Sequence, residues 1–382
     1  MKVESCVSYD RLKSWFLRRT PASGVRRLPT MLGAIGSDIG TSRKENQDRA
    51  AVIRTRDSKG VGYTLIALSD GMGGMQSGGV CASVTLAAFF TSFVIRSKVG
   101  IKFDQLIIEA ALDANETVYD QFRGRGGATL SSLLIRDDGV CVWLNVGDSR
   151  IYAVTGSDLY QHTTDDTIAG QLGSKFDGLK SRSDLLQFIG MGEELEPHYS
   201  YLNLDGYGNF LITSDGVHYL EEQVMGNIAV NAPDSASCLR RLIDVSKWLG
   251  GRDNCTAIIF PRSGGAFDEE SFVTNGVCEV WDSFGDLQVY IDEKLDASSV
   301  YKLKTSGGNQ EVVDVKAGIR NKLKAKKNDI SSKKAFLPVS ISSVGEDLNS
   351  VLESDSRLLK KSSEKNKDKS SSQLKVFFPS KD

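Results

Sequence analysis

Short apolar runs separated by polar, glycine-containing turns dominate the first 260 residues of the chain. Runs of this length, bounded by Asp-Gly and Gly-Ser-Asp turns, predict β-strands. The regular spacing between residues 128 and 162 predicts consecutive antiparallel strands there. The predicted strands lie at 34–39, 50–54, 61–68, 128–136, 140–146, 150–154, 159–162, 199–204, 209–213 and 255–260.

Helical spacing of apolar residues replaces this pattern in three stretches. We predict helices over 78–96, 102–122 and 235–249, and short helices with a loop in the more polar stretch 163–195. Antiparallel strand runs with helices inserted predict an α+β layered domain rather than an alternating βαβ one. The phosphate-binding patterns GxGxxG and GxxxxGK[ST] are absent from the sequence, which disfavours a Rossmann or P-loop nucleotide site.

Composition divides the 382 residues into four parts. Residues 1–30 form a basic N-terminal arm that we expect to pack loosely, and 31–262 hold the main domain. Residues 263–303 keep a few strand-like pieces and form a possible small β module. Residues 304–382 are rich in Lys and Ser, and we expect a basic, largely disordered tail.

Charge and residue usage exclude several classes of function. The net charge of −2 gives no overall attraction to nucleic acid, and the basic run 315–334 lacks interleaved aromatic residues. The six cysteines form no CxxC pair and the three histidines no HExxH, so neither a zinc site nor a His-based nucleophilic triad is expected. Neither a secretory signal nor a membrane span is predicted, which makes the cytoplasm the expected location.

Aspartates at strand ends are the candidate chemistry. The run that ends at Ser69 is followed by Asp70 and Gly71, and the same Ser-Asp-Gly device recurs at Ser214–Gly216. Three further aspartates adjoin strand ends: Asp48, Asp148 and Asp253. Carboxylates converging on one rim repel each other unless cations lie between them, and oxygen donors suit Mg²⁺ or Mn²⁺. Arg43 is the best-placed group to bind phosphate oxygens beside such cations. The alternative is that these are ordinary β-turn aspartates.

Six motifs, in order along residues 33–260, resemble the protein phosphatase 2C group of metal-dependent Ser/Thr phosphatases in its bacterial form. The stretch along which they are spread is more than half of the chain, and their order makes the resemblance specific. They are Arg43-x-x-Asn46-Gln47-Asp48, Asp70-Gly71-Met72-Gly73-Gly74, Gly127-Ala128-Thr129, Gly147-Asp148-Ser149-Arg150, Ser214-Asp215-Gly216 and Asp253-Asn254.

The resemblance implies a four-layer αββα fold, with a central β-sandwich of two antiparallel sheets flanked by pairs of helices and followed by a C-terminal extension. It implies two Mn²⁺ or Mg²⁺ ions at one end of the sandwich and a hydroxide between them that attacks phosphorus directly. The implied ligand roles are as follows: Asp70 bridges the two ions, Asp215 and Asp253 complete one, the Gly71 carbonyl with Asp48 serves the other, and Asp148 serves a third, weaker ion. Arg43 would bind the phosphate of a phosphoserine or phosphothreonine protein, and an opposing kinase is an implied partner.

Three departures from the family pattern concern single positions. Met72 stands where many eukaryotic members have a His that is a candidate general acid. Gln47 stands where some members have a metal-linked carboxylate, and Asp166 stands where a Thr-x-Asp-His-Ser stretch would have His. Since each bridging ligand is retained, activity is still expected. Residues 167–195 would form the variable flap beside the site.

Two other readings stay open. A catalytically weak or inactive phosphatase-like scaffold could act through the C-terminal extension. Residues 373–379 loosely resemble peptides that bind bacterial sliding clamps, although so short a match in a Lys/Ser-rich tail is mostly a chance event.

Overall fold

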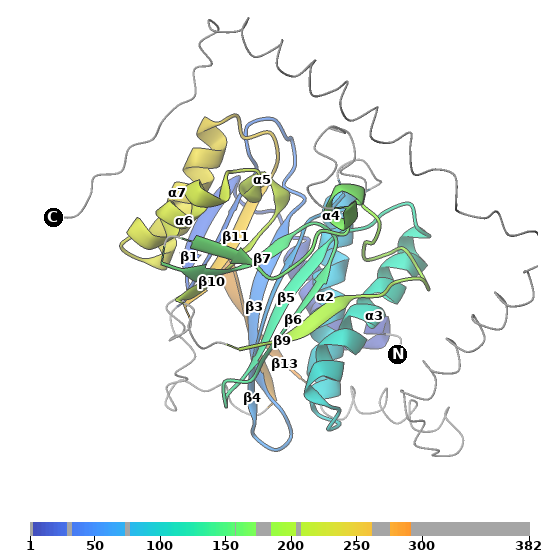
Figure 1. Cartoon of the computed structure of the whole chain (residues 1–382). Coiled ribbons are helices and arrows are strands. Elements are labelled where there is room, and N and C mark those ends of the chain that lie inside the picture. Colours follow the sequence, from blue (N-terminus) through green and yellow to red (C-terminus); the bar gives the residue numbers. More distant parts are fainter. Residues whose placement is uncertain are drawn as a thin grey trace, which may run out of the picture. The chain divides into compact units, whose positions relative to one another are not determined.

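Two antiparallel β-sheets packed face to face form the centre of the molecule (Figure 1). The structure, a computed structural model, describes residues 3–28, 33–72, 77–156, 158–172, 185–203, 208–261 and 276–291. The first sheet has the order β1-β2-β11-β10-β7-β8 and the second β13-β12-β3-β4-β5-β6-β9. The strands are β1 Ser23–Arg27, β2 Ala34–Asp38, β3 Arg49–Arg56, β4 Gly62–Ser69, β5 Leu130–Arg136, β6 Cys141–Val146, β7 Arg150–Thr155, β8 Asp158–Gln161, β9 His198–Leu202, β10 Asn209–Thr213, β11 Cys255–Pro261, β12 Val277–Asp282 and β13 Gly285–Tyr290.

Strand β4 explains why the apolar runs are continuous rather than alternating. Leu65 and Ala67 point to the helices outside the second sheet, whereas Ile66 and Leu68 point into the core between the sheets. Every residue of β4 is therefore buried, because both faces of the strand are covered. The core between the sheets draws equally on the first sheet, through residues such as Ile258 of β11.

Helices cover the outer face of each sheet. Those packed on the second sheet include α1 and the longer pair α2 and α3, and those on the first are α5, α6 and α7. The helical elements are η1 Val3–Ser5, α1 Val7–Phe16, α2 Gly78–Ser97, α3 Phe103–Phe122, α4 Ile168–Leu172, α5 Asp215–His218, α6 Glu222–Asn231 and α7 Ser235–Trp248. This four-layer arrangement confirms the predicted αββα fold class.

Helix α2 is the most apolar of the described helices. By length and composition it is the one helix of the described residues that would be able to cross a membrane, but 94% of its apolar window is buried inside the fold. Its burial follows from its position, since α1, α3 and the second sheet all contact it. A helix that is hydrophobic all round is expected in such a place.

The two ends of the described chain differ from the prediction. Residues 3–28 are not a loosely packed arm, because α1 buries Tyr9, Leu12 and Phe16 in the core and β1 pairs with β2. Residues 276–291 are not a separate module, because β12 pairs with β3 and extends the second sheet. The predicted limits 31–262 therefore cut through one packed unit. The tail predicted for 304–382 lies outside the described residues.

One connection in the middle of the chain was also predicted wrongly. Strands β5 and β6 pair as a hairpin, but β7 pairs with β10 in the other sheet rather than with β6. The turn Gly147–Ser149 carries the chain from one sheet to the other at this point. The regular turn spacing predicted a continuous meander, and sequence spacing alone does not distinguish a hairpin from such a crossing. Helix α6 was not predicted at all.

Candidate active site

The five predicted aspartates gather where strand ends of both sheets meet. Asp48 immediately precedes β3 and Asp70 follows β4, and these strands pair with Arg49 opposite Ser69. Asp215 opens α5 directly after β10, and Asp253 precedes the neighbouring strand β11. The hydroxyl of Ser214 bridges the two sheets by donating to the Asp48 carboxylate at 2.8 Å. The sequence-predicted set therefore forms one site rather than five separate turns.

Electrostatics confirms that these carboxylates face each other. Burial raises the pKa of Asp70 well above its usual value, and Asp48, Asp215, Asp148 and Asp253 all raise it further. Burial likewise raises the pKa of Asp48 to about 7 and that of Asp215 to about 6, with added repulsion from Asp215 and Asp253 respectively. Asp148 follows the same rule, with a pKa raised to about 7 by burial and then by Asp215. Such shifts are typical of functional sites.

Asp48 has an unsatisfied oxygen. Its residue is 3% exposed, and Oδ1 is buried without a hydrogen-bond partner among the described residues. The other oxygen, Oδ2, accepts from Ser214. Since an unpaired carboxylate oxygen in the interior is costly, the arrangement fits a cation at this position.

The two Ser-Asp-Gly turns need glycine because another main chain approaches them closely. A Cβ on Gly71 would lie 2.2 Å from the carbonyl oxygen of Gly78, and one on Gly216 would lie 1.9 Å from that of Asn254. Neither position therefore admits a side chain without moving the backbone. The close approach of these segments of the same chain also places main-chain carbonyls near the aspartate turns.

Main-chain bonds hold the Asp70 turn in place. Asp70 donates its N–H to Thr129 Oγ1 at 2.9 Å and accepts the Thr129 N–H at 2.8 Å. Thr129 Oγ1 also lies 2.8 Å from Ser149 Oγ, on the turn that carries Asp148. Thr129 was part of a motif but not a predicted site residue, so its role in connecting two of the aspartate turns is new.

Asn254 fixes the loop that carries Arg43 and Asp48. Its side-chain oxygen accepts from the N–H of Gln47 at 2.9 Å, and its amide nitrogen donates to the carbonyls of Ile39 and Glu45 at 2.9 and 3.0 Å. Sequence reasoning missed this role. The signal in the sequence was the side-chain amide of Asn254, directly after Asp253 and before the last predicted strand.

Arg43 lies at the exposed rim of the site. Its side chain is 40% exposed, and Nη2 pairs with Asp253 Oδ2 at 2.6 Å. This hydrogen bond raises the pKa of Arg43, and Asp215 and Asp70 add smaller attractions. The guanidinium is thus next to the acidic cluster and open to solvent, as a phosphate-binding group must be.

No three His, Cys, Asp or Glu side chains within the described ranges already stand together in a metal-ligand arrangement. Two of the aspartates instead pair with protein groups: Asp253 pairs with Arg43, and Asp48 Oδ2 accepts from Ser214. The donor set is nevertheless all oxygen, strongly acidic and buried, which matches Mg²⁺ or Mn²⁺ rather than softer metals.

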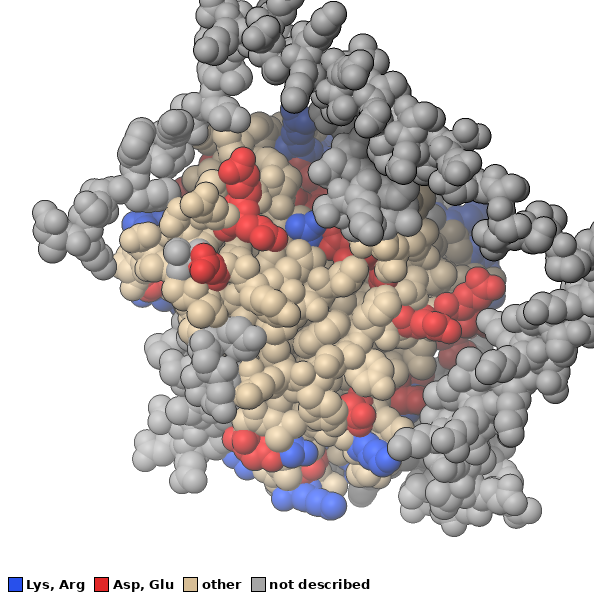
Figure 2. Space-filling view, in the orientation of Figure 1, with Lys and Arg blue, Asp and Glu red and all other residues tan. Residues whose placement is uncertain are grey.

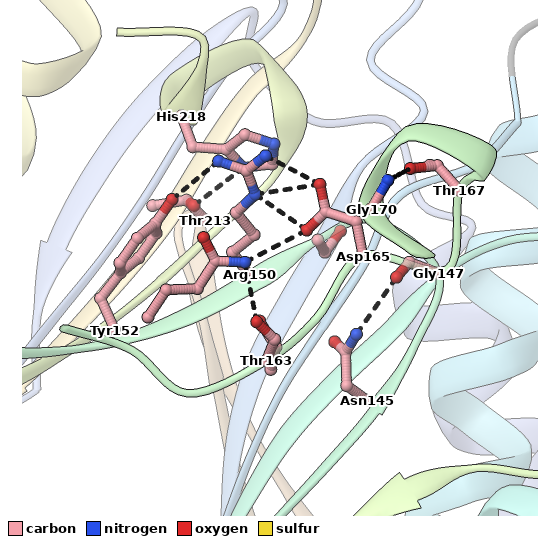
Figure 3. Close-up of polar contacts among 12 residues, drawn as sticks. Asn145, Gly147, Arg150, Tyr152, Thr163, Asp165, Thr167, Gly170, Thr213 and His218 are labelled. Atoms are coloured by element: carbon pink, nitrogen blue, oxygen red, sulfur yellow. Dashed lines mark hydrogen bonds and ion pairs between the residues drawn. The ribbon is translucent and has the colours of Figure 1, made fainter. Parts of the chain in front are cut away.

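A polar network supports the turn that carries Asp148 (Figure 3). The guanidinium of Arg150 pairs with Asp165 at 2.7 Å and donates to the Tyr152 hydroxyl at 3.1 Å. His218 lies beside this guanidinium in Figure 3. Burial, with a smaller contribution from Arg150, lowers the pKa of His218 to about 3, so the imidazole is neutral at physiological pH.

Asp166, the departure from the family's His, has a defined structural role. Its buried carboxylate accepts the N–H of Gly147 at 2.9 Å and lies 2.9 Å from His198 Nε2. Its main-chain N–H donates to the Gly147 carbonyl, and its carbonyl accepts from the N–H of Leu186, which lies within the predicted flap 167–195. The substitution therefore still ties the Asp148 turn to the segment after the flap. Within the predicted flap 167–195, residues 173–184 lie outside the described residues.

Comparisons with known proteins agree with the predicted resemblance. No protein-family model matches the chain. It is 25% identical over 237 residues to protein phosphatase PhpP of Streptococcus pneumoniae, covering 58% of this chain and 94% of that protein. It is 27% identical over 240 residues to the serine/threonine protein phosphatase PstP of Mycobacterium tuberculosis, covering 59% of this chain and 44% of that protein.

Solved structures support the fold. The serine/threonine phosphatase Stp1 from Staphylococcus aureus superimposes with a TM-score of 0.53 at 20% identity, over 64% of this chain and 98% of that one. A structure described as a bacterial serine phosphatase gives a TM-score of 0.54 at 21% identity, over 60% of this chain. The chain is thus similar to bacterial phosphatases of the 2C type, and the predicted recognition is confirmed. More than a third of the chain lies outside the similarity.

Proposed function

We propose that this protein is a metal-dependent phosphatase that hydrolyses phosphoserine and phosphothreonine on proteins. The observation that carries the proposal is the convergence of five aspartates from both sheets on one buried site, with an unpaired oxygen on Asp48. The similarity to PhpP and PstP, both named as protein phosphatases, supports the reaction class. A buried cluster of like charges has no evident value to stability, so its retention favours a ligand.

In this proposal the carboxylates would hold two divalent cations. Asp70 would contact both, Asp48 and the Gly71 carbonyl would serve one, and Asp215 and Asp253 would serve the other. Asp148 would serve a third, weaker position. When bound, the two divalent cations would supply an activated water and charge stabilisation for direct displacement at phosphorus.

Arg43 would exchange partners during catalysis. It now pairs with Asp253, one of the proposed ligands. With Asp253 serving as a cation ligand, the Arg43 guanidinium would be available to hold two phosphate oxygens in its planar fork. This exchange predicts that Arg43 affects substrate binding more than cation binding.

The described site offers no evident acid for the leaving oxygen. Met72 cannot donate a proton, and His218 is half-buried, lies 3.1 Å through Nδ1 from Thr213 Oγ1 and has a pKa lowered to about 3. We propose that solvent water protonates the leaving seryl or threonyl oxygen, because an alkoxide is a poor leaving group and must depart as the alcohol.

The alternative of an inactive scaffold draws no support from the described residues, because every proposed carboxylate is in place. The segments that the alternative needs, including residues 373–379 and the basic tail, lie outside the described residues. An opposing kinase as partner stays a prediction.

The test is hydrolysis of a phosphothreonine peptide by the full chain with Mn²⁺ and with EDTA. Wild type should be active with Mn²⁺ only, and Asp215→Asn should lose roughly 100-fold or more of kcat/KM because a ligand charge is removed. Asp113→Asn is the matched control, since Asp113 is also buried but pairs with Arg96 between α2 and α3. Equal losses in both variants, or no turnover by folded wild type, would contradict the proposal.

A further inference from the structure

Two segments outside the family-like stretch meet behind the candidate active site. The motifs lie within residues 33–260, whereas α1 precedes this stretch and the β12–β13 hairpin follows it. Residues at the end of each segment lie around one hollow together with Asn46 and Asp48. A hollow of about 20 Å³ remains between them, lined by Arg18, Asp48, Arg49, Asp282 and Phe284 among others.

Arg49 connects α1 to this loop. Its Nε donates to the carbonyl of Phe16 at 2.8 Å and to Ser83 Oγ at 3.0 Å. Its Nη1 donates to the carbonyls of Asn46 and Asp48 at 2.8 and 2.7 Å. One guanidinium therefore fixes the main chain on both sides of Gln47, immediately next to the Asp48 carboxylate.

The acceptor on α1, the Phe16 carbonyl, is held in place and suits the positive charge of the Arg49 guanidinium. Phe16 is the last residue of α1, so its carbonyl belongs to the negative end of the helix dipole and lacks an intrahelical partner. Ser83 of α2 donates to the same carbonyl at 3.1 Å. Leu12 and Phe16 are each 2% exposed, which anchors the helix end in the core.

The β12–β13 hairpin holds the chain that leaves α1. The guanidinium of Arg18 pairs with both oxygens of Asp282, at 2.7 and 2.8 Å, and lies 3.6 Å from the centroid of the Trp15 ring. Asp282 Oδ1 also accepts the N–H groups of Phe284 and Gly285, which form the hairpin turn. A bidentate pair of this kind has defined geometry as well as energy.

We propose that Arg49 is a positioning residue for Asp48, and that α1 and the β12–β13 hairpin are therefore working parts of the active site. This inference rests on the proposed function, because Asp48 matters only if it serves a cation. Without Arg49 the carbonyls of Asn46 and Asp48 lose their shared donor, and the Asp48 carboxylate is free to turn away from the cation position. Groups that orient metal ligands in this way typically change metal affinity 10- to 100-fold when removed.

The experiment compares Arg49→Gln and Arg49→Lys with wild type, using the full chain. Calorimetric titration with Mn²⁺ is the first readout, and kcat and KM with p-nitrophenyl phosphate are the second. We expect Arg49→Gln to raise the Kd for Mn²⁺ by roughly tenfold or more. Arg49→Lys, which keeps the charge but cannot reach all four acceptors, should give a smaller increase. At saturating Mn²⁺ the KM should stay near wild type, because Arg43 is untouched.

Arg54→Gln is the control, because Arg54 is an arginine on the same strand, is 3% exposed and lies near the other end of β3. It should lower the melting temperature but leave the Kd for Mn²⁺ within about twofold, as distant sites act independently. If Arg49→Gln does not fold, Arg49→Lys carries the comparison. Equal Mn²⁺ affinity in the Arg49 and Arg54 variants would overturn the inference about Arg49 and leave the proposed function standing. Absence of Mn²⁺ binding and turnover in wild type would overturn the proposed function as well.

Discussion

The two ends of the second sheet use the same residue types to opposite effect. At the far end, the β3–β4 and β5–β6 turns carry Asp57, Asp137 and Asp138 around a hollow of about 860 Å³. There Asp138 makes a two-point pair with Arg136 at 2.8 and 2.6 Å, and Asp57 accepts two N–H groups of its own turn. Figure 2 shows acidic and basic side chains side by side at the lower end of the molecule.

The pKa values record this difference. The hydrogen bond from Arg136 lowers the pKa of Asp138, whereas burial and neighbouring carboxylates raise the pKa values of Asp48, Asp70 and Asp215. The far end thus contains paired charges around a large hollow, and the site end contains buried carboxylates that raise one another's pKa values. Cavity size alone would point to the far end, whereas mutual repulsion among buried carboxylates points to the candidate site.

The largest expected effect comes from removing the central charge at the site end. Asp70→Asn should lower kcat/KM for a phosphopeptide by roughly three orders of magnitude, or about 4 kcal/mol. The metal-free variant should at the same time be at least as stable as wild type, because a repelled carboxylate is gone. Activity assays and urea unfolding in EDTA test both statements. A variant that loses activity and stability together would indicate a structural role instead.

The next largest effect concerns the segments behind the site. A fragment of residues 31–262 should be unstable and nearly inactive, because it lacks α1 and leaves β3 as an unpaired edge. Loss of Leu12 and Phe16 alone removes about 1.5–3 kcal/mol of burial free energy per side chain. Circular dichroism melting of the fragment and the full chain is the measurement. A fragment as stable as the full chain would contradict the packing described for 3–28 and 276–291.

A moderate effect is expected from pH. The folded pKa values of Asp48 and Asp148 (about 7) and of Asp215 (about 6) exceed the unfolded value of about 3.9. Their contribution to the free energy of unfolding is therefore fully present below pH 4 and is lost as pH rises toward 7. In EDTA the protein should be more stable at pH 5 than at pH 8, by a few kcal/mol. Mn²⁺ should reverse this order, because ligands must lose protons to bind it. Chemical unfolding at both pH values, with and without Mn²⁺, tests the sign.

The smallest effect belongs to the far end. Asp138→Asn should leave kcat/KM unchanged and cost less than about 1 kcal/mol, since the pair with Arg136 is exposed. Because the folded pKa of Asp138 is lowered, its small contribution is lost as pH falls, opposite to the site aspartates. A tenfold change in activity would show that the two ends are coupled.

The sequence predicted most of the fold because its apolar runs are local signals. Strand β10 was predicted with its observed limits, and α2 and α3 within a residue or so, since their patterns are set by covered faces. The role of α1 was not predictable in the same way. This helix packs on α2, and Arg18, which follows it, pairs with Asp282. Both partners are distant in sequence, and the basic residues of the segment suggested a solvent-exposed arm.

The aspartates of the candidate site were predicted from the sequence, but the side chains that hold their loops in place were not. The recurrence of Ser-Asp-Gly after two apolar runs indicated the Asp70 and Asp215 turns, and ordinary β-turn aspartates were the alternative interpretation of the same pattern. Asn254 and Arg49 act through main-chain carbonyls, and nothing in a one-dimensional pattern says which carbonyl a side chain reaches. The assignment of individual ligands to cations stays a prediction.

The Ser214–Asp48 hydrogen bond has a consequence for how the protein matures. Asp48 and Asp70 come from one sheet, and Asp215 and Asp253 come from the other. The two proposed cations would therefore engage all four carboxylates only in chains whose sheets have already docked in register. Cation binding would then stabilise the docked state by mass action. The gain in the free energy of unfolding would be RT ln(1 + [M]/Kd), where [M] is the cation concentration. Scarcity of the cation would reduce the amount of native protein in a cell as well as the turnover of each molecule.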